Sequence, residues 1–126
     1  MESKAKEWLE QADADYITAQ VLLKSKRYYA SVSFSQQSAE KALKSVYLVE
    51  KSSLAPKIHD LLELARLVGT PKKIKENAEK LTGTYFTSRY PDAAPSIPVR
   101  YYTLQKAQEH LYEAEVILQW PKSKIQ

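Results

Sequence analysis

The residues of this chain that are best suited to binding a phosphate lie in one segment, residues 88–99. Arg89 and Asp92 stand close together there, with Tyr90 between them. A guanidinium binds a phosphate through a planar fork of donors, and a nearby carboxylate can hold that fork in place. Arg89, Tyr90 and Asp92 are therefore predicted to bind a nucleotide or RNA. The structural alternative is an Arg–Asp pair that fixes the segment to the rest of the fold, with Tyr90 packed against a helix.

A second group of polar residues recurs at helical spacing, so that its members share one face of a predicted helix. The group consists of Gln37, Glu40, Lys41 and Lys44. Such a face can line a groove between two protomers and contact a nucleotide or RNA. The alternative, favoured by the general behaviour of charged helix faces, is a solvated surface or a polar network between helices.

The two histidines are weaker candidates. His59 and Asp60 stand at the predicted start of a helix, where capping and compensation of the helix dipole are favoured over catalysis. His110 falls inside the last predicted helix and is expected to face away from the apolar stripe that contains Leu104, Leu111 and Leu118. The two are far apart, without the spacing of metal ligands, so the sequence predicts no metal site and no cofactor.

Two further clusters have both a functional and a structural interpretation. Residues 100–102, Arg-Tyr-Tyr, could stack on an RNA base, and Arg100 is predicted to bind nucleotide or RNA. Tyrosines at a helix entrance are more often half-buried. Lys72, Lys73 and Lys75 oppose a helix dipole, which indicates either an external anion or a role in solubility.

Helical periodicity predicts the elements that must position these residues. Apolar residues recur every three or four positions in five stretches, which predict helices at about residues 5–24, 28–51, 58–68, 71–85 and 104–120. The predicted helix boundaries are Gly69 after the third helix, Thr70 and Pro71 as the N-cap and first residue of the fourth, Thr103 as the N-cap of the last, and Trp120-Pro121 as its end.

Two features refine this pattern. Small residues fill the first half of the second helix and predict a close helix crossing there: Ala30, Ser31, Ser33, Ser35, Ser38 and Ala39. Residues 88–99 contain three prolines and cannot be helical throughout. The sequence thus predicts an all-α, up-and-down bundle of about five helices with a proline-rich loop before the last helix. We expect one domain in residues 1–120 and a short frayed tail in residues 121–126.

The composition excludes several classes of site. The 126 residues contain no cysteine, which rules out disulfides, thiolate metal sites and cysteine nucleophiles. Two glycines are too few for a Gly-rich phosphate loop, and a net charge of +4 favours anionic partners only mildly. No apolar run approaches the ~18 residues of a membrane helix, and no signal-peptide pattern follows Met1, so we expect a cytoplasmic protein without membrane contact.

The order of several motifs resembles the HEPN family. The matching pieces, spread through most of the chain, are Trp8-Leu9-Glu10-Gln11-Ala12, the run from Gln36 to Lys44, His59-Asp60-Leu61, Tyr85, Arg89-Tyr90-Pro91-Asp92, Tyr101 and Ala107. The resemblance implies a helical bundle that commonly dimerises. It also implies frequent pairing with a minimal nucleotidyltransferase, often as a toxin–antitoxin system.

One branch of the family consists of metal-independent ribonucleases with an Arg followed a few residues later by a His. Arg89 matches that arginine, but residues 90–96 contain no His and the next is His110. We therefore expect a homodimeric, nucleotide- or RNA-interacting partner of a nucleotidyltransferase, without catalysis of its own. The alternatives are a ribonuclease toxin, in which Arg89 holds the phosphate and another group replaces the His, and a purely structural dimerisation module.

Overall fold

The structure is a computed structural model that describes residues 2–51 and 54–125; Met1, Ser52, Ser53 and Gln126 lie outside it. All regular elements in the described residues are helices: α1 (Glu2–Lys24), α2 (Tyr28–Lys51), α3 (Leu61–Leu67), α4 (Lys72–Thr82), α5 (Thr84–Thr87), α6 (Pro98–Tyr101) and α7 (Leu104–Ile125). Five have seven or more residues and two are single turns. The predicted all-α bundle of about five helices is confirmed. None of the described helices is both long and apolar enough to cross a membrane.

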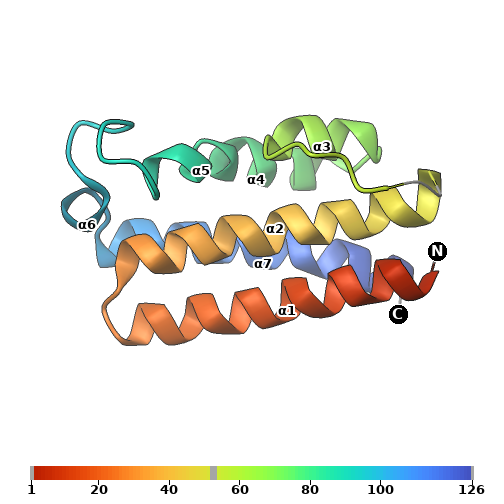
Figure 1. Ribbon diagram of the computed structural model, residues 1–126, viewed down its shortest axis with the longest axis horizontal. Helices are drawn as coiled ribbons and strands as arrows, with labels where there is room; N and C mark the ends of the chain where they lie inside the picture. Colours follow the sequence, from red (N-terminus) through yellow and green to blue (C-terminus); the bar gives the residue numbers. More distant parts are fainter. Residues whose placement is uncertain (1, 52–53, 126) are drawn as a thin grey trace.

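The helices form two layers that meet along α2. Figure 1 shows α1, α2 and α7 side by side, with α3, α4 and α5 covering α2 and α7. The direction of α1 is opposite to that of α2 and α7, so the first turn of α1 and the last turn of α7 lie at the same end (Figure 1). As a result α2 contacts every other helix in the bundle.

The small residues of α2 allow the close crossing that the sequence predicted. The hydroxyl of Ser31 donates to the carbonyl oxygen of Ala19 at 2.8 Å, and that of Ser38 donates to the carbonyl of Ala12 at 2.7 Å. All four residues are buried. A serine hydroxyl reaches a main-chain carbonyl of a neighbouring helix only where the two backbones approach closely, so alanine and serine fix the spacing of α1 and α2.

An apolar core fills the space between the layers. Its largest fully buried side chains are Leu9, Leu43, Leu61, Leu64, Leu81, Ile117 and Leu118. Each contributes about 1.5–3 kcal/mol relative to an exposed side chain. Because these residues come from α1, α2, α3, α4 and α7, the core holds both layers together and gives the polar side chains on α2 a rigid support.

The C-terminal end of α7 differs from the sequence prediction. The helix was expected to end at Trp120-Pro121, with a frayed tail, but it continues through Pro121 to Ile125. Proline removes one backbone donor, yet the Pro121 ring is buried and Ile125 packs against the core. Lys122 also pairs with Asp13 of α1, with Nζ 2.6 Å from Oδ1. These contacts outweigh the loss of a single helical hydrogen bond.

The ends of α3 and α4 differ in part from prediction. Helix α3 begins at Leu61 rather than at residue 58, because Asp60 caps it. Gly69 follows α3 with a φ of +64°, as expected for a residue at C′. The N-cap of α4 is Pro71 and not Thr70, because the Thr70 hydroxyl turns back to donate to the carbonyl of Ala65.

The fourth predicted helix is divided in two. Helix α4 ends at Thr82, and Tyr85 belongs to the separate turn α5. The Thr84 hydroxyl donates to the carbonyl of Leu81 at 2.7 Å, a side-chain to main-chain bond of the kind that bends helices. Thr103 does cap α7, since its hydroxyl accepts from the amide of Lys106.

Candidate functional site

Three polar residues stand on successive turns of α2, where it meets the α3–α5 layer. Gln36 donates through Nε2 to Oε1 of Glu40 at 2.9 Å, and Lys44 donates through Nζ to Oε2 at 2.9 Å. Gln36 is fully buried and the side chain of Lys44 is only 6% exposed. A buried ammonium is costly unless it is paired, so Lys44 depends on an ionised Glu40.

The environment of Glu40 keeps its carboxylate charged. Burial alone would raise the pKa of Glu40, but the hydrogen bonds from Lys44 and Gln36, together with the charge of Lys44 and a bond to His59, outweigh it and leave the pKa below its ordinary value. This stretch of α2 is therefore a polar network between helices rather than a solvated surface.

His59 is brought to this network by the segment that precedes α3. The Asp60 side chain accepts from the amides of Leu62 and Glu63 and from the hydroxyl of Thr82, so the backbone beside His59 is held to both α3 and α4. His59 Nδ1 lies 3.1 Å from Oε1 of Glu40. Because an ionised carboxylate only accepts, Nδ1 carries the proton in this contact.

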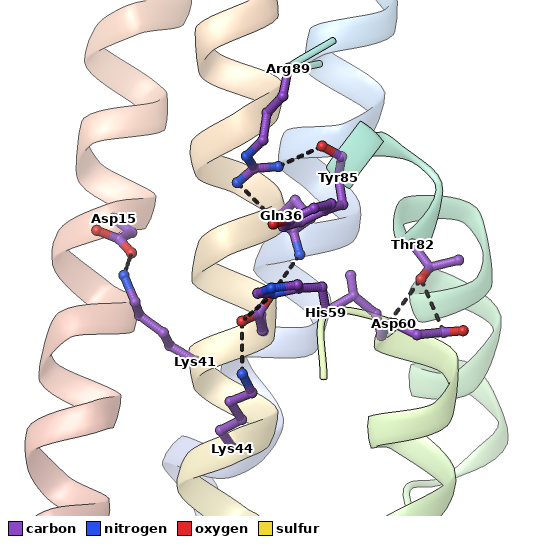
Figure 2. Close-up of polar contacts among 11 residues, drawn as sticks. Asp15, Gln36, Lys41, Lys44, His59, Asp60, Thr82, Tyr85 and Arg89 are labelled. Atoms are coloured by element: carbon purple, nitrogen blue, oxygen red, sulfur yellow. Dashed lines mark hydrogen bonds and ion pairs between the residues drawn. The ribbon is translucent and has the colours of Figure 1, made fainter. Parts of the chain in front are cut away.

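Tyr85 joins His59 to Arg89 in a stack. The rings of His59 and Tyr85 are 4.2 Å apart with an interplanar angle of 15°, and Cζ of Arg89 lies 4.2 Å from the centre of the Tyr85 ring. Figure 2 shows the tyrosine ring between the guanidinium and the imidazole. Such contacts favour a fixed orientation of both groups.

The stack is attached to α2 at both ends. Arg89 donates through Nη2 to Oε1 of Gln36 at 3.2 Å and through Nη1 to the carbonyl of Tyr85 at 2.8 Å, while His59 is bonded to Glu40 (Figure 2). These bonds engage two of the five N–H groups of the guanidinium. The arginine is thus oriented by its neighbours and keeps donors for a further acceptor.

A pocket of about 230 Å³ opens beside this stack, and we call it the Arg89 pocket. It is lined by Gln37, Glu40, Lys41, His59, Tyr85 and Arg89. Lys41 is held at its edge by an ion pair with Asp15 of α1, and Asp15 also accepts from Gln11. Lys44 is buried behind Glu40 and does not line the pocket, whereas Lys41 lines it, is 27% exposed and has three ammonium donors, of which Asp15 takes one. The donors that face the pocket are therefore mainly those of Arg89 and Lys41, which suit an anion.

Comparison with known proteins identifies the family. A family model described as the HEPN domain matches residues 5–125. The chain belongs to the HEPN family. It is similar to the crystal structure of TT1696 from Thermus thermophilus, with a TM-score of 0.86 and 35% identity over 96% of this chain and 98% of that one. It is also similar to ST0689, an archaeal HEPN homologue, with a TM-score of 0.82 and 32% identity over 97% and 98% of the two chains. Comparison with curated proteins found no match.

The HEPN fold brings together many of the predicted binding residues. Arg89, Gln37, Glu40 and Lys41 line one pocket, and Lys44 lies behind it as the partner of Glu40. The expected pairing of Arg89 with Asp92 is not formed among the described residues. A helical turn follows α5, in which the amides of Arg89 and Tyr90 both bond to the carbonyl of Phe86. A side chain in a helical turn points back along the helix, which directs Arg89 toward Tyr85 and away from Asp92.

The other candidates lie apart from the pocket. Tyr90 is largely exposed and packs on Phe86, with ring centres 6.2 Å apart. Arg100 is exposed on α6 and does not line the Arg89 pocket. Tyr101 is half-buried, and Tyr102 is buried and hydrogen-bonded to Thr87, so both tyrosines pack against the fold before the start of α7. Burial raises the pKa of the Tyr102 hydroxyl.

The side chain of His110 was expected to face away from the apolar stripe of its helix, but it is mostly buried. The buried face of α7 contains Ala107, Ala114 and Ile117, whereas Leu104 is exposed. His110 lies partly buried next to that face, with Nδ1 2.7 Å from Oε1 of Glu113. Its ring meets the Tyr102 ring edge-on at 6.1 Å. It does not line the Arg89 pocket.

Sequence reasoning missed the roles of Gln36, His59 and Tyr85. The spacing of Gln36, Glu40 and Lys44 by four residues indicated that they share one helix face. It did not show that the α3–α5 layer covers this face. Nothing in the sequence could connect His59 with Tyr85 or Arg89, because their contacts depend on how the α3–α5 layer packs on α2. Within the described ranges, no group of three or more His, Asp or Glu side chains is placed to hold a metal ion.

Proposed function

We propose that this HEPN protein binds the phosphate of a nucleotide or of RNA in the Arg89 pocket, and that it does so as a homodimeric partner of a nucleotidyltransferase in a toxin–antitoxin-like pair. The observation that carries the binding proposal is the arginine itself. Its guanidinium is fixed by Tyr85 and Gln36, opens on a pocket, and retains unused donors beside Lys41.

A pre-oriented arginine favours binding for a physical reason. Fixing a flexible side chain normally costs about 0.5–1.5 kcal/mol on association. Here the hydrogen bonds and the ring of Tyr85 fix it in the free protein. The pairing with a nucleotidyltransferase rests on membership of the HEPN family and on the resemblance of the motifs.

Thermal unfolding tests the binding proposal. We expect mono- and dinucleotides or short RNA to raise the melting temperature of the wild type, because a ligand at a hundred times its Kd stabilises the folded state by about 2.7 kcal/mol. Arg89→Ala should abolish this shift. Arg66→Ala, which removes an exposed arginine on α3, should retain it. A shift of equal size in both variants would contradict the proposal, as would no shift in the wild type.

Co-expression tests the proposed assembly. A nucleotidyltransferase that is the partner of this chain should co-elute with it in size-exclusion chromatography after co-expression. This chain alone should sediment at twice its 14.4 kDa mass. A monomer that never associates with the transferase would remove this part of the proposal and leave nucleotide binding to be judged separately.

A second candidate function, a metal-independent ribonuclease, gains support from His59. The family motif places a His after the Arg, which this sequence lacks, yet His59 lies on the far face of Tyr85 from Arg89 (Figure 2). Its Nδ1 is held by Glu40, and its Nε2 has no hydrogen-bond partner within the part of the chain that the structure describes. A carboxylate at Nδ1 is the arrangement that prepares Nε2 to act as a general base.

In such a reaction Nε2 of His59 would take the proton of a ribose 2′-hydroxyl. The 2′-oxygen would bond to the phosphorus, and the 5′-oxygen would leave with a proton from solvent, which gives a 2′,3′-cyclic phosphate. Arg89 would stabilise the charge on the phosphate oxygens. Incubation of labelled RNA with a chelator tests this candidate. Cleavage by the wild type that is lost in both Arg89→Ala and His59→Ala would support it, whereas intact RNA would remove it.

The third reading, a purely structural dimerisation module, makes a different prediction. Arg89→Ala would then lower the free energy of unfolding, through loss of the Gln36 and Tyr85 contacts, and change no binding or cleavage.

A further inference from the structure

A second and larger pocket adjoins the Arg89 pocket, and we call it the Phe86 pocket. Its volume is about 450 Å³, and its lining includes Ile58, Thr82, Gly83 and Phe86. His59 and Tyr85 line both pockets, so the stacked pair forms a shared wall. The two pockets are therefore neighbouring parts of one surface hollow.

The shared wall presents an aromatic face to the Phe86 pocket. One face of the His59 ring is covered by Tyr85, and the His59 side chain, which lines the Phe86 pocket, is 51% exposed. Phe86 is 58% exposed and meets Tyr85 edge-on, with ring centres 5.1 Å apart. Single-stranded nucleic acids and nucleotides are commonly held by stacking of their bases on such aromatic planes.

We propose that the two pockets form one bipartite site for a purine nucleotide. The phosphate lies against Arg89 and Lys41, and the base enters the Phe86 pocket and stacks on the exposed part of the His59 ring. The proposal rests on the proposed function, since the phosphate site is the same, and it adds the base-binding half. Because His59 and Tyr85 line both pockets, a phosphate in the Arg89 pocket and a base in the Phe86 pocket would contact the same pair of rings.

The size and character of the pocket favour a purine. Stacking energy grows with the ring area in contact, and a bicyclic base can cover the imidazole and still reach Ile58 or Phe86. The volume of about 450 Å³ accommodates such a base. A pyrimidine would cover less of the same surface.

His59 has two properties that substitutions can separate, its flat aromatic ring and its hydrogen bond to Glu40. Stacking requires only a flat aromatic ring, whereas the bond to Glu40 requires a ring nitrogen. His59→Phe keeps the first and removes the second. His59→Ala removes both. Because the residue is half exposed, neither change is expected to prevent folding.

Calorimetric titrations with AMP and with ribose 5-phosphate test the base subsite. The wild type should bind AMP about ten-fold more tightly than ribose 5-phosphate, because a stacked base adds affinity that the sugar phosphate lacks. This advantage should fall below about three-fold in His59→Ala and persist in His59→Phe. Phe86→Ala should reduce it in part. Tyr112→Ala, which removes an exposed aromatic ring on α7, should leave it unchanged and serves as the matched control.

Further titrations identify the ligand class. UMP should bind more weakly than AMP. A free nucleotide and one residue of a single strand present the same chemistry here, so a short oligoadenylate that binds more tightly than AMP identifies a strand, and equal affinity identifies the free nucleotide.

The outcomes distinguish this inference from the proposed function. Equal affinity of the wild type for AMP and ribose 5-phosphate would overturn the base subsite and leave phosphate binding intact. An advantage for AMP that survives in His59→Ala would overturn the stacking role. Absence of binding by every phosphate-bearing ligand would instead overturn the proposed function, and the bipartite site with it.

Discussion

Glu40 accepts hydrogen bonds from the side chains of Gln36, Lys44 and His59, and each of the three belongs to the candidate site or supports it. Gln36 also accepts from Arg89, Lys44 is buried behind the Arg89 pocket, and His59 forms the wall that the two pockets share. A buried carboxylate with three donors stabilises the fold more than an exposed i,i+4 ion pair, which contributes only a few tenths of a kcal/mol. It connects a buried cation with the residues around the Arg89 pocket.

Glu40→Gln should therefore destabilise the protein, because the buried ammonium of Lys44 loses its counter-charge. We expect a loss of about 2–3 kcal/mol in the free energy of unfolding at pH 7. The pKa of Glu40 lies below its ordinary value of 4.5, so its contribution is present above about pH 4.5 and disappears as the pH falls through the folded-state pKa. The difference between wild type and variant should shrink over that range in urea unfolding at several pH values.

Asp13→Asn provides the control for this experiment. It removes the partner of Lys122 in an ion pair that is far more exposed than the Glu40–Lys44 pair. The free energy of unfolding should fall by less than about 1 kcal/mol. A Glu40→Gln effect as small as that of Asp13→Asn would contradict the account, and so would a difference that stays constant down to pH 3.

Sequence reasoning placed two helix caps correctly because their contacts are local. Asp60 and Thr103 cap their helices because a cap involves only the next two or three amides. The direction of Arg89 and the inward turn of His110 were not predictable in the same way. Both depend on which neighbouring elements pack against them.

At the scale of elements, the α1–α2 crossing is held by serine hydroxyls that donate to backbone carbonyls. Ser38 makes such a bond, whereas the neighbouring hydroxyl of Ser35 is buried without a hydrogen-bond partner among the described residues. The two serines therefore form a natural pair for comparison.

Ser38→Ala should lower the free energy of unfolding by about 1 kcal/mol, the net value of a buried hydrogen bond. Ser35→Ala should be neutral or stabilising by up to about 1 kcal/mol, since it removes a buried polar group that has no partner. Chemical denaturation of both variants measures the difference. Equal losses would show that the hydrogen bonds do not determine the stability of this crossing.

The N-cap of α3 links element structure to the candidate site. Asp60→Ala should cost about 1–2 kcal/mol of stability, because two helix amides and the Thr82 hydroxyl lose their acceptor. Asp60→Asn should retain most of it, since an amide oxygen also caps. Thermal unfolding of the two variants checks this expectation, and an Asn variant as unstable as the Ala variant would contradict the capping role.

Helix existence was predictable from periodicity, while several helix ends were not. The apolar pattern correctly gave the two long N-terminal helices and their close crossing. It failed at Pro121, where burial of the ring carries α7 beyond the expected stop, and at Gly83, where one expected helix becomes α4 and α5. In both cases the helix end depends on interactions that apolar periodicity alone does not show.

At the scale of the whole molecule, the candidate site lies where the two layers meet. Helix α2 supplies its polar residues, the segment before α3 supplies His59, α5 supplies Tyr85, and the turn after α5 supplies Arg89 (Figures 1 and 2). The HEPN fold was foreseeable from the order of the motifs. The pocket was foreseeable only in part, since the sequence indicated the α2 face and Arg89 but not the layer contact that joins them.

The central claim is that this junction binds a phosphate through Arg89, and titration calorimetry of wild type and Arg89→Ala with the same purine 5′-monophosphate tests it most directly. We predict measurable binding by the wild type and a loss of at least about ten-fold in Arg89→Ala, because charged hydrogen bonds of this kind contribute about 1.5–3 kcal/mol. Both proteins should show the same far-UV circular dichroism spectrum. Equal affinity in the two proteins, or no heat of binding in the wild type, would contradict the account.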